Sequence, residues 1–169
     1  MNEATDLFAE LSTTLWDQRE ALDQLSCKLT VEQLIVAAGH PRWLPRVDEE
    51  VRSAVQDFRL GEIARASAAQ ALATACGLPH DATLEDFAKS APEPWGTLLR
   101  DHDTALRELS AEVRLLAAET SELIDACARA LHETLESMDA VSSIRRKPSS
   151  RAATSPGRTQ TPRGKRAGR

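Results

Sequence analysis

The residues best suited to catalysis or metal binding in this 169-residue chain are four histidines and three cysteines. His40 and His80 lie in predicted turns, and His102 and His132 lie far apart on one predicted helix. The sequence contains no CxxC pair, no H-E-x-x-H or G-x-S-x-G motif and no glycine-rich phosphate-binding loop. We therefore expect no enzymatic activity, no catalytic residue, no cofactor and no metal site.

The triplet Asp101-His102-Asp103 is the one local cluster that looks suited to proton transfer. Consecutive residues of a helix point in different directions, so the three side chains cannot act together. His102 falls on an apolar seam, which predicts a structural histidine, either packed or partly exposed. The two acids lie near the start of a predicted helix, where the helix dipole favours negative charge.

The cysteines Cys27, Cys76 and Cys127 are widely separated and flanked by helical, partly apolar sequence. This pattern favours buried, reduced thiols over disulfides. The first ten residues contain three acids and no basic residue, unlike a signal peptide, and no stretch approaches 18 uninterrupted apolar residues. We expect a soluble, cytoplasmic protein with no membrane span.

The charge of the chain is divided sharply between its two parts. Residues 1–144 carry 12 basic and 26 acidic residues, whereas residues 145–169 carry nine basic residues and no acidic one. We predict a helical domain over residues 1–141 and a disordered basic tail over residues 142–169, which lacks the apolar residues to fold alone. The tail is either a solvated extension or a nonspecific contact for nucleic acid, an anionic surface or the acidic body of this chain. No aromatic residue of the tail is present for stacking on nucleic acid bases.

Two long amphipathic helices precede the most extended one. The first ends at Gly39-His40-Pro41, because Gly suits the end of a helix and Pro blocks its continuation. The second begins near Trp43 and ends at Cys76-Gly77-Leu78-Pro79, and whether Gly61 breaks it is left open. The apolar seam of the first helix recurs in alternating steps of four and three, with Gln18 as its polar member: Ala4, Phe8, Leu11, Leu15, Gln18, Leu22, Leu25 and Leu29.

A short helix and a third long helix complete the predicted fold. Thr83 and Asp86 form a capping box at the start of the short helix. Pro94 to Met138 contains no Pro after Pro94 and no Gly after Gly96, and its apolar residues again recur in steps of three and four. No strand-like alternation occurs. We predict an all-α fold, an elongated antiparallel bundle or coiled coil of three long helices plus one short helix.

The last long helix exceeds the length that its neighbours can cover. It spans about 44 residues against about 35 and 33, so roughly ten residues, or ~15 Å, extend past them. An uncovered apolar strip marks a partner site. We predict that a partner protein contacts the C-terminal part of this helix. The candidate contact residues are Leu123, Ile124, Cys127, Leu131, Leu135 and Met138.

The chain resembles the flagellar export chaperone FlgN family, in particular its actinobacterial form, over roughly residues 5–138. The first helix is acidic and Leu-rich, as in that family. Family members often carry Asn in the middle of the last helix, where this chain has Ala117 to Leu123. The resemblance is carried mainly by local strings at the turns: Ala37-Ala38-Gly39-His40-Pro41-Arg42-Trp43-Leu44, Ala64-Arg65-Ala66, Cys76-Gly77-Leu78-Pro79, Ala82-Thr83-Leu84 and Ala91-Pro92-Glu93-Pro94-Trp95 with Leu98-Leu99 and His102.

The resemblance implies a cytoplasmic chaperone that binds hook-associated proteins, through helices at the client C-terminus, and presents them to the flagellar export apparatus. The residues themselves establish only an extended helical surface. A different class, a structural coiled-coil adaptor or oligomerisation module with a tail that contacts nucleic acid or another anionic partner, stays open. An uncovered seam can also pair with a second copy to form a homodimer.

Overall fold

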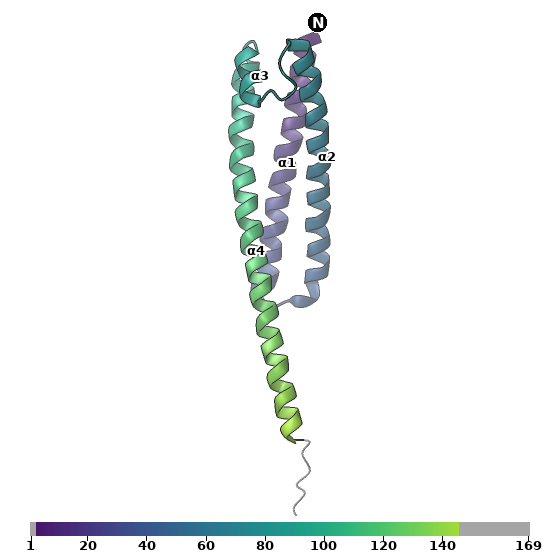
Figure 1. Cartoon of the computed structure of the whole chain (residues 1–169), viewed down its shortest axis with the longest axis vertical. Coiled ribbons are helices and arrows are strands. Elements are labelled where there is room, and N and C mark those ends of the chain that lie inside the picture. Colours follow the sequence, from purple (N-terminus) through teal and green to yellow (C-terminus); the bar gives the residue numbers. More distant parts are fainter. Residues whose placement is uncertain (1–2, 146–169) are drawn as a thin grey trace, which may run out of the picture. The chain divides into compact units, whose positions relative to one another are not determined.

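The computed structural model describes residues 3–145, and within this range it contains helices and no strand (Figure 1). The all-α prediction is confirmed. Residues 146–169 of the predicted basic tail lie outside the described residues. The chain divides into two compact units, one ending at Ala130 and the other beginning at Leu131, and each is treated by itself below. The helices are α1 (Glu3–Ala37), a 3₁₀ turn (Pro41–Trp43), α2 (Leu44–Cys76), α3 (Leu84–Ser90) and α4 (Trp95–Arg145).

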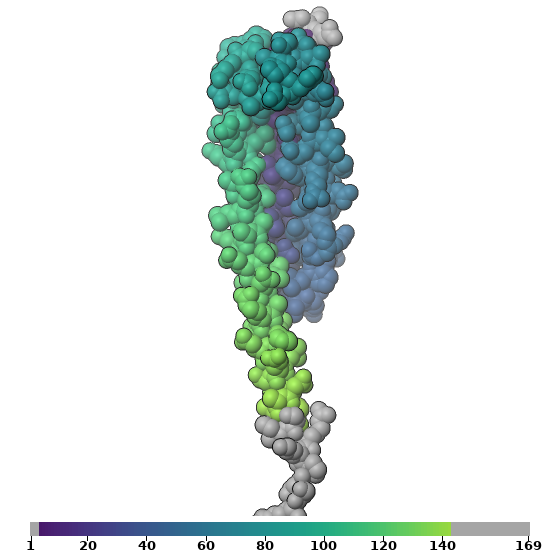
Figure 2. All heavy atoms as spheres, viewed as in Figure 1, coloured from purple at the N-terminus to yellow at the C-terminus, as the bar shows by residue number. Residues whose placement is uncertain are grey.

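In the first unit, α1 packs against both α2 and the first part of α4. Figure 2 shows side chains of α1 between those of α2 and α4 along this face. Helices α1 and α2 run antiparallel, and α4 returns in the direction of α1 (Figure 1). The predicted seam of α1 forms the centre of this packing, because its apolar members from Phe8 to Leu29 are all buried.

Two apolar clusters lie along this seam. The cluster nearer the α3 end joins α1 and α4 to α2 and α3, with the buried residues Phe8, Leu11, Leu15, Ala68, Leu72, Ala73, Phe87, Ala88 and Leu99. The second cluster is centred on Leu22, Leu25, Leu29 and Val113, with half-buried residues of α2 such as Val51 and Phe58 packed against it. Through Leu99 and Val113, the first part of α4 contributes to both clusters.

The helix ends follow the glycine signals in the sequence. Gly39 follows α1 with a φ of +68°, and Gly77 caps α2 with a φ of +67°, which is the left-handed region that favours glycine. The amide of Leu78 donates to the carbonyl of Ala73 at 2.9 Å. Helix α2 continues through Gly61 without a break, which resolves the question that the sequence left open.

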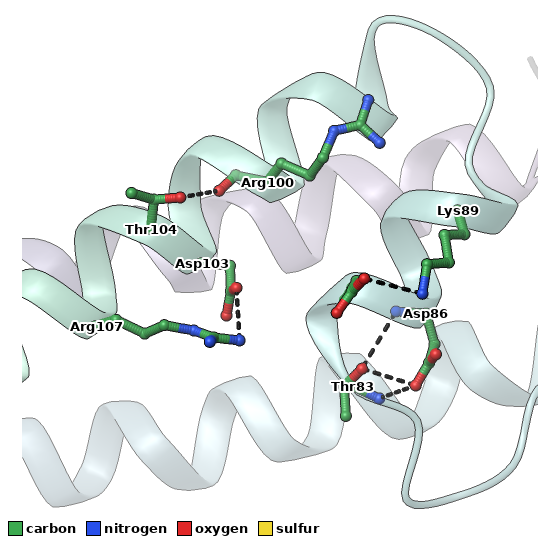
Figure 3. A network of polar contacts seen from close by, with 8 residues as sticks. Thr83, Asp86, Lys89, Arg100, Asp103, Thr104 and Arg107 are labelled. Carbon is green, nitrogen blue, oxygen red and sulfur yellow. Dashed lines mark hydrogen bonds and ion pairs between the residues drawn. The ribbon is translucent and has the colours of Figure 1, made fainter.

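The capping box at α3 has the predicted partners (Figure 3). The amide of Asp86 donates to Thr83 Oγ1 at 3.2 Å, and the amide of Thr83 donates to Asp86 Oδ2 at 2.9 Å. The Thr83 hydroxyl also donates to Asp86 Oδ2 at 2.7 Å, and this bond, followed by the one from the Thr83 amide, lowers the pKa of Asp86. At the start of α4, Trp95 stacks on Phe8 with ring centroids 6.1 Å apart, so this corner is anchored to α1.

Two details differ from the sequence predictions. Helix α4 ends at Arg145, seven residues beyond Met138, because residues 139–145 contain no Gly or Pro and the change of composition there does not itself break a helix. All three cysteines are free, but they are not buried: Cys27 is exposed, and Cys76 and Cys127 are half-buried. Cys27 lies two residues from both Leu25 and Leu29, which places it on the side of α1 opposite the seam.

Candidate binding surface

The cluster around His102 is structural. The His102 side chain is completely buried, and its Nε2 lies 3.2 Å from Ser12 Oγ on α1. The rings of His102 and Trp16 pack edge to face, with their centroids 5.1 Å apart. Burial lowers the pKa of His102, and the positive charge of Arg19 is the second cause of this lowering. The prediction of a structural histidine is confirmed, and of the two expected environments His102 has the packed one.

The acids beside His102 point elsewhere. Asp101 is exposed, and Asp103 forms an ion pair with Arg107 one turn later on α4, at 2.8 Å (Figure 3). The triplet therefore holds no shared proton-transfer geometry. Among the described residues, no group of three His, Cys, Asp or Glu side chains is arranged to hold a metal ion. None of the described helices combines the length and the apolar character needed to cross a membrane.

The second unit presents an apolar strip on the last turns of α4. Leu131, Leu135, Met138 and Val141 are each 60–65% exposed, and we call these four residues the α4 strip. Their spacing of four, three and three residues places them on one face of the helix. Three of them, Leu131, Leu135 and Met138, are residues that the sequence predicted for client contact.

The other three predicted residues belong to the first unit and are half-buried. Leu123, Ile124 and Cys127 precede the strip on α4 at helical spacing. Leu123 and Cys127 continue the seam that begins at Leu99 in steps of three and four, so part of their surface is covered within the first unit. The structure thus provides an exposed surface at three predicted positions and a partly covered one at the other three.

Ile124 lines a pocket of about 380 Å³ where α1, α2 and α4 meet. Its other lining residues are Glu32 from α1 and Leu44, Pro45 and Asp48 from α2, and we call this site the Glu32 pocket. Glu32 is only 6% exposed. Burial raises the pKa of the Glu32 carboxyl group, and the negative charge of Asp48 is the second cause of this rise. Three of the five lining residues are apolar, and the two acidic ones are Glu32 and the half-buried Asp48.

Sequence reasoning missed Glu32 and Val141. The predicted seam of α1 ends at Leu29, but Glu32 lies three residues further and Val36 four residues beyond that, and both are buried. A carboxyl group on a seam position was therefore the signal for the Glu32 pocket. Val141 follows Met138 by three residues and continues the exposed face, but it lies beyond Met138, where the sequence predicts the end of this helix.

Comparison with known proteins gives one family. The family model described as FlgN protein matches residues 1–159, which is most of the chain. No curated protein and no protein of known structure gives a significant match.

Proposed function

Because this chain belongs to the FlgN family, a family of flagellar export chaperones, we propose that it binds hook-associated proteins in the cytoplasm and keeps them unassembled. It then delivers them to the flagellar type III export apparatus. The family membership supports the class of client and the pathway. The observation that carries a binding role for this chain is the α4 strip, four neighbouring apolar side chains exposed on one helical face.

The strip suits an amphipathic helix as its ligand. Leu131, Leu135 and Met138 have the i, i+4, i+7 spacing with which one helix packs along another. A client helix, such as one at the C-terminus of a hook-associated protein, would bury its own apolar face against this strip. Segments that drive self-association of the client are then covered until export.

The test measures the binding of the full chain to each of the hook-associated proteins that form the hook-filament junction (the junction proteins). The double variant Leu135→Ala with Met138→Ala is measured in parallel. Burying an apolar side chain contributes about 1.5–3 kcal/mol, and these two are already partly shielded by their own helix. We expect at least a tenfold loss of affinity, which corresponds to about 1.4 kcal/mol. The helix should remain intact in this variant, because alanine has the most favourable helix propensity.

The matched control is Leu60→Ala with Ile63→Ala on α2. These residues are also exposed and apolar, at 59% and 68%, but they lie on another helix. Client affinity should be unchanged in this control. The proposal fails if no complex forms at micromolar concentration and the junction proteins are secreted normally without this protein. If the α4 variant instead abolishes only self-association, the adaptor or homodimer interpretation replaces it.

A further inference from the structure

Gln18 is the polar member of the α1 seam, and it is buried, with an exposed fraction of 2%. Buried polar atoms in proteins are nearly always hydrogen-bonded. Nε2 of Gln18 donates to Oε1 of Glu62 on α2. Oε1 of Gln18 is buried as well, and it has no hydrogen-bond partner among residues 3–145, which the structure describes. One half of this amide is thus paired, and the other half is not.

The contact with Glu62 fixes the orientation of the Gln18 amide. An ionised carboxylate can only accept hydrogen bonds, so the NH₂ group of Gln18 must face Glu62. The reverse orientation would bring two acceptor oxygens together. Glu62 is also held by Arg65, whose Nε lies 3.4 Å from the same carboxylate oxygen. The buried atom without a partner is therefore the acceptor Oε1 of Gln18, and it requires a hydrogen-bond donor.

Gln18 lines a pocket of about 140 Å³ between α1, α2 and α4, near the middle of α1, and we call it the Gln18 pocket. Half of its lining residues are apolar, including Leu22 of α1 and Leu106 of α4. The polar lining residues are Gln18, Glu62, Arg65 and Ser110. One water molecule takes up about 30 Å³ in the liquid, so the pocket is large enough for a small polar ligand.

The Gln18 pocket lies between the two apolar clusters of the first unit. Leu15 belongs to one cluster and Leu22 to the other. Gln18 follows Leu15 by three residues and precedes Leu22 by four, so it occupies the seam position that separates them. A ligand bound to Gln18 Oε1 would therefore lie at a polar layer within the apolar core.

The polar lining residues define the chemistry of this ligand. Glu62 and Arg65 form an ion pair, so their charges offset each other and favour neither a cation nor an anion. Ser110 has a hydroxyl group that can donate or accept, and Arg65 has N–H groups that donate. A purely apolar ligand would leave the buried Oε1 of Gln18 unpaired, which is costly. Water is neutral, and it both donates and accepts, so it matches all of these groups.

We propose that the Gln18 pocket binds an internal water molecule that donates a hydrogen bond to Oε1 of Gln18. The remaining hydrogen-bonding capacity of this water is available to Ser110 of α4 and to the ion pair of Glu62 with Arg65 on α2. The water would link the helices at the layer between the two apolar clusters, where the leucines of the seam provide no polar contact. The proposal does not depend on the proposed chaperone function.

The first measurement uses the native full chain in solution and needs no substitution. Nuclear Overhauser effects (NOEs) between water and the protein are recorded by NMR, because their sign distinguishes a bound water molecule from one that exchanges faster than the protein tumbles. We expect NOEs of the bound type to the methyl protons of Leu22 and Leu106, which line the pocket. The absence of these NOEs would overturn the proposal.

The second measurement compares two substitutions on α1 by water magnetic relaxation dispersion, which counts long-lived bound water molecules. Gln18→Leu replaces the acceptor by an apolar side chain of similar size, and its helical content is checked by circular dichroism. The matched control is Gln24→Leu, which makes the same change at an exposed position of the same helix. We expect the signal to fall by at least the contribution of a single water molecule in Gln18→Leu and to be unchanged in Gln24→Leu.

A third variant, Ser110→Ala, separates a bound water from the exchanging hydroxyl of Ser110. The NOEs to Leu22 and Leu106 should persist in this variant, because Gln18 Oε1 still accepts from the water. Their complete loss would assign them to the hydroxyl group and overturn the proposal. An unchanged relaxation signal in Gln18→Leu, or an equal decrease in Gln24→Leu, would also overturn it. If Gln18→Leu loses its helical content, the native chain and Ser110→Ala decide the question.

Discussion

The same substitution, glycine to alanine, should have opposite effects at Gly61 and Gly96, two glycines that both lie within helices. At Gly61, an added Cβ would lie 3.6 Å from Cγ of Gln18, which is ordinary van der Waals contact with a side chain. At Gly96, it would lie 2.8 Å from the backbone carbonyl oxygen of Ala88. The first site can accept a methyl group, and the second cannot without a shift of the backbone.

The magnitudes follow from these contacts. Within a helix, alanine is more favourable than glycine by about 1 kcal/mol, so Gly61→Ala should raise the free energy of unfolding by about that amount. Gly96 is the second residue of α4, where the gain is smaller. Forcing a methyl group into a packed site costs about 1–3 kcal/mol. This cost exceeds the gain, so Gly96→Ala should be destabilising.

The assay is thermal and urea unfolding of the full chain followed by far-ultraviolet circular dichroism. A change of 1 kcal/mol corresponds to a shift of about 2–4 °C in Tm for a chain of this size. We expect an increase in Tm for Gly61→Ala and a decrease for Gly96→Ala. A higher Tm for Gly96→Ala would refute the close packing of α3 on the start of α4, and a lower Tm for Gly61→Ala would refute the open site on α2.

Two further predictions concern the α3 cap and the buried histidine. Thr83→Ala removes the capping box and should cost about 0.5–2 kcal/mol of unfolding free energy, whereas Ser at this position should retain most of it; equal losses for Ala and Ser would contradict a hydrogen-bonding role. Because the pKa of His102 is lower in the folded chain than its ordinary value of 6.5, the unfolded chain takes up a proton first as the pH falls below about 6.5, and stability is lost. Urea unfolding from pH 7.5 to 5.5 should show this loss, and it should be smaller in His102→Gln; an identical pH dependence in the two proteins would exclude His102 as its source.

The sequence was sufficient to predict the helices, because the signals involved are local. Gly39 and Gly77 adopt the left-handed conformation expected at helix ends, and Thr83 with Asp86 forms the expected cap. The seam of α1 is buried as its four-three spacing predicted. Each of these depends on a few neighbouring residues and on a single helical period.

The features that were not predicted depend on neighbours distant in the sequence. Periodicity places Glu32 on the seam but does not show that Leu44, Pro45 and Ile124 surround it without supplying a cation. Similarly, the flanking apolar residues of Cys27 gave the wrong expectation, because burial depends on which face of α1 is covered. The predicted end of α4 is too early, because composition indicates where apolar packing stops, and a helix can continue without such packing.

The hydrogen bonds between α1 and α4 determine the register of these two helices. A seam of leucines that repeats every seven residues would accept a slide of one heptad with little loss of apolar contact. Polar side chains would not, since Ser12 pairs with His102, Ser26 donates to Glu112 at 2.7 Å, and Gln33 donates to the carbonyl of Leu116 at 3.3 Å. A one-heptad slide would break all three bonds together and leave the buried His102 ring without Ser12. The polar residues beside this seam thus select one alignment from several that the leucines alone would permit.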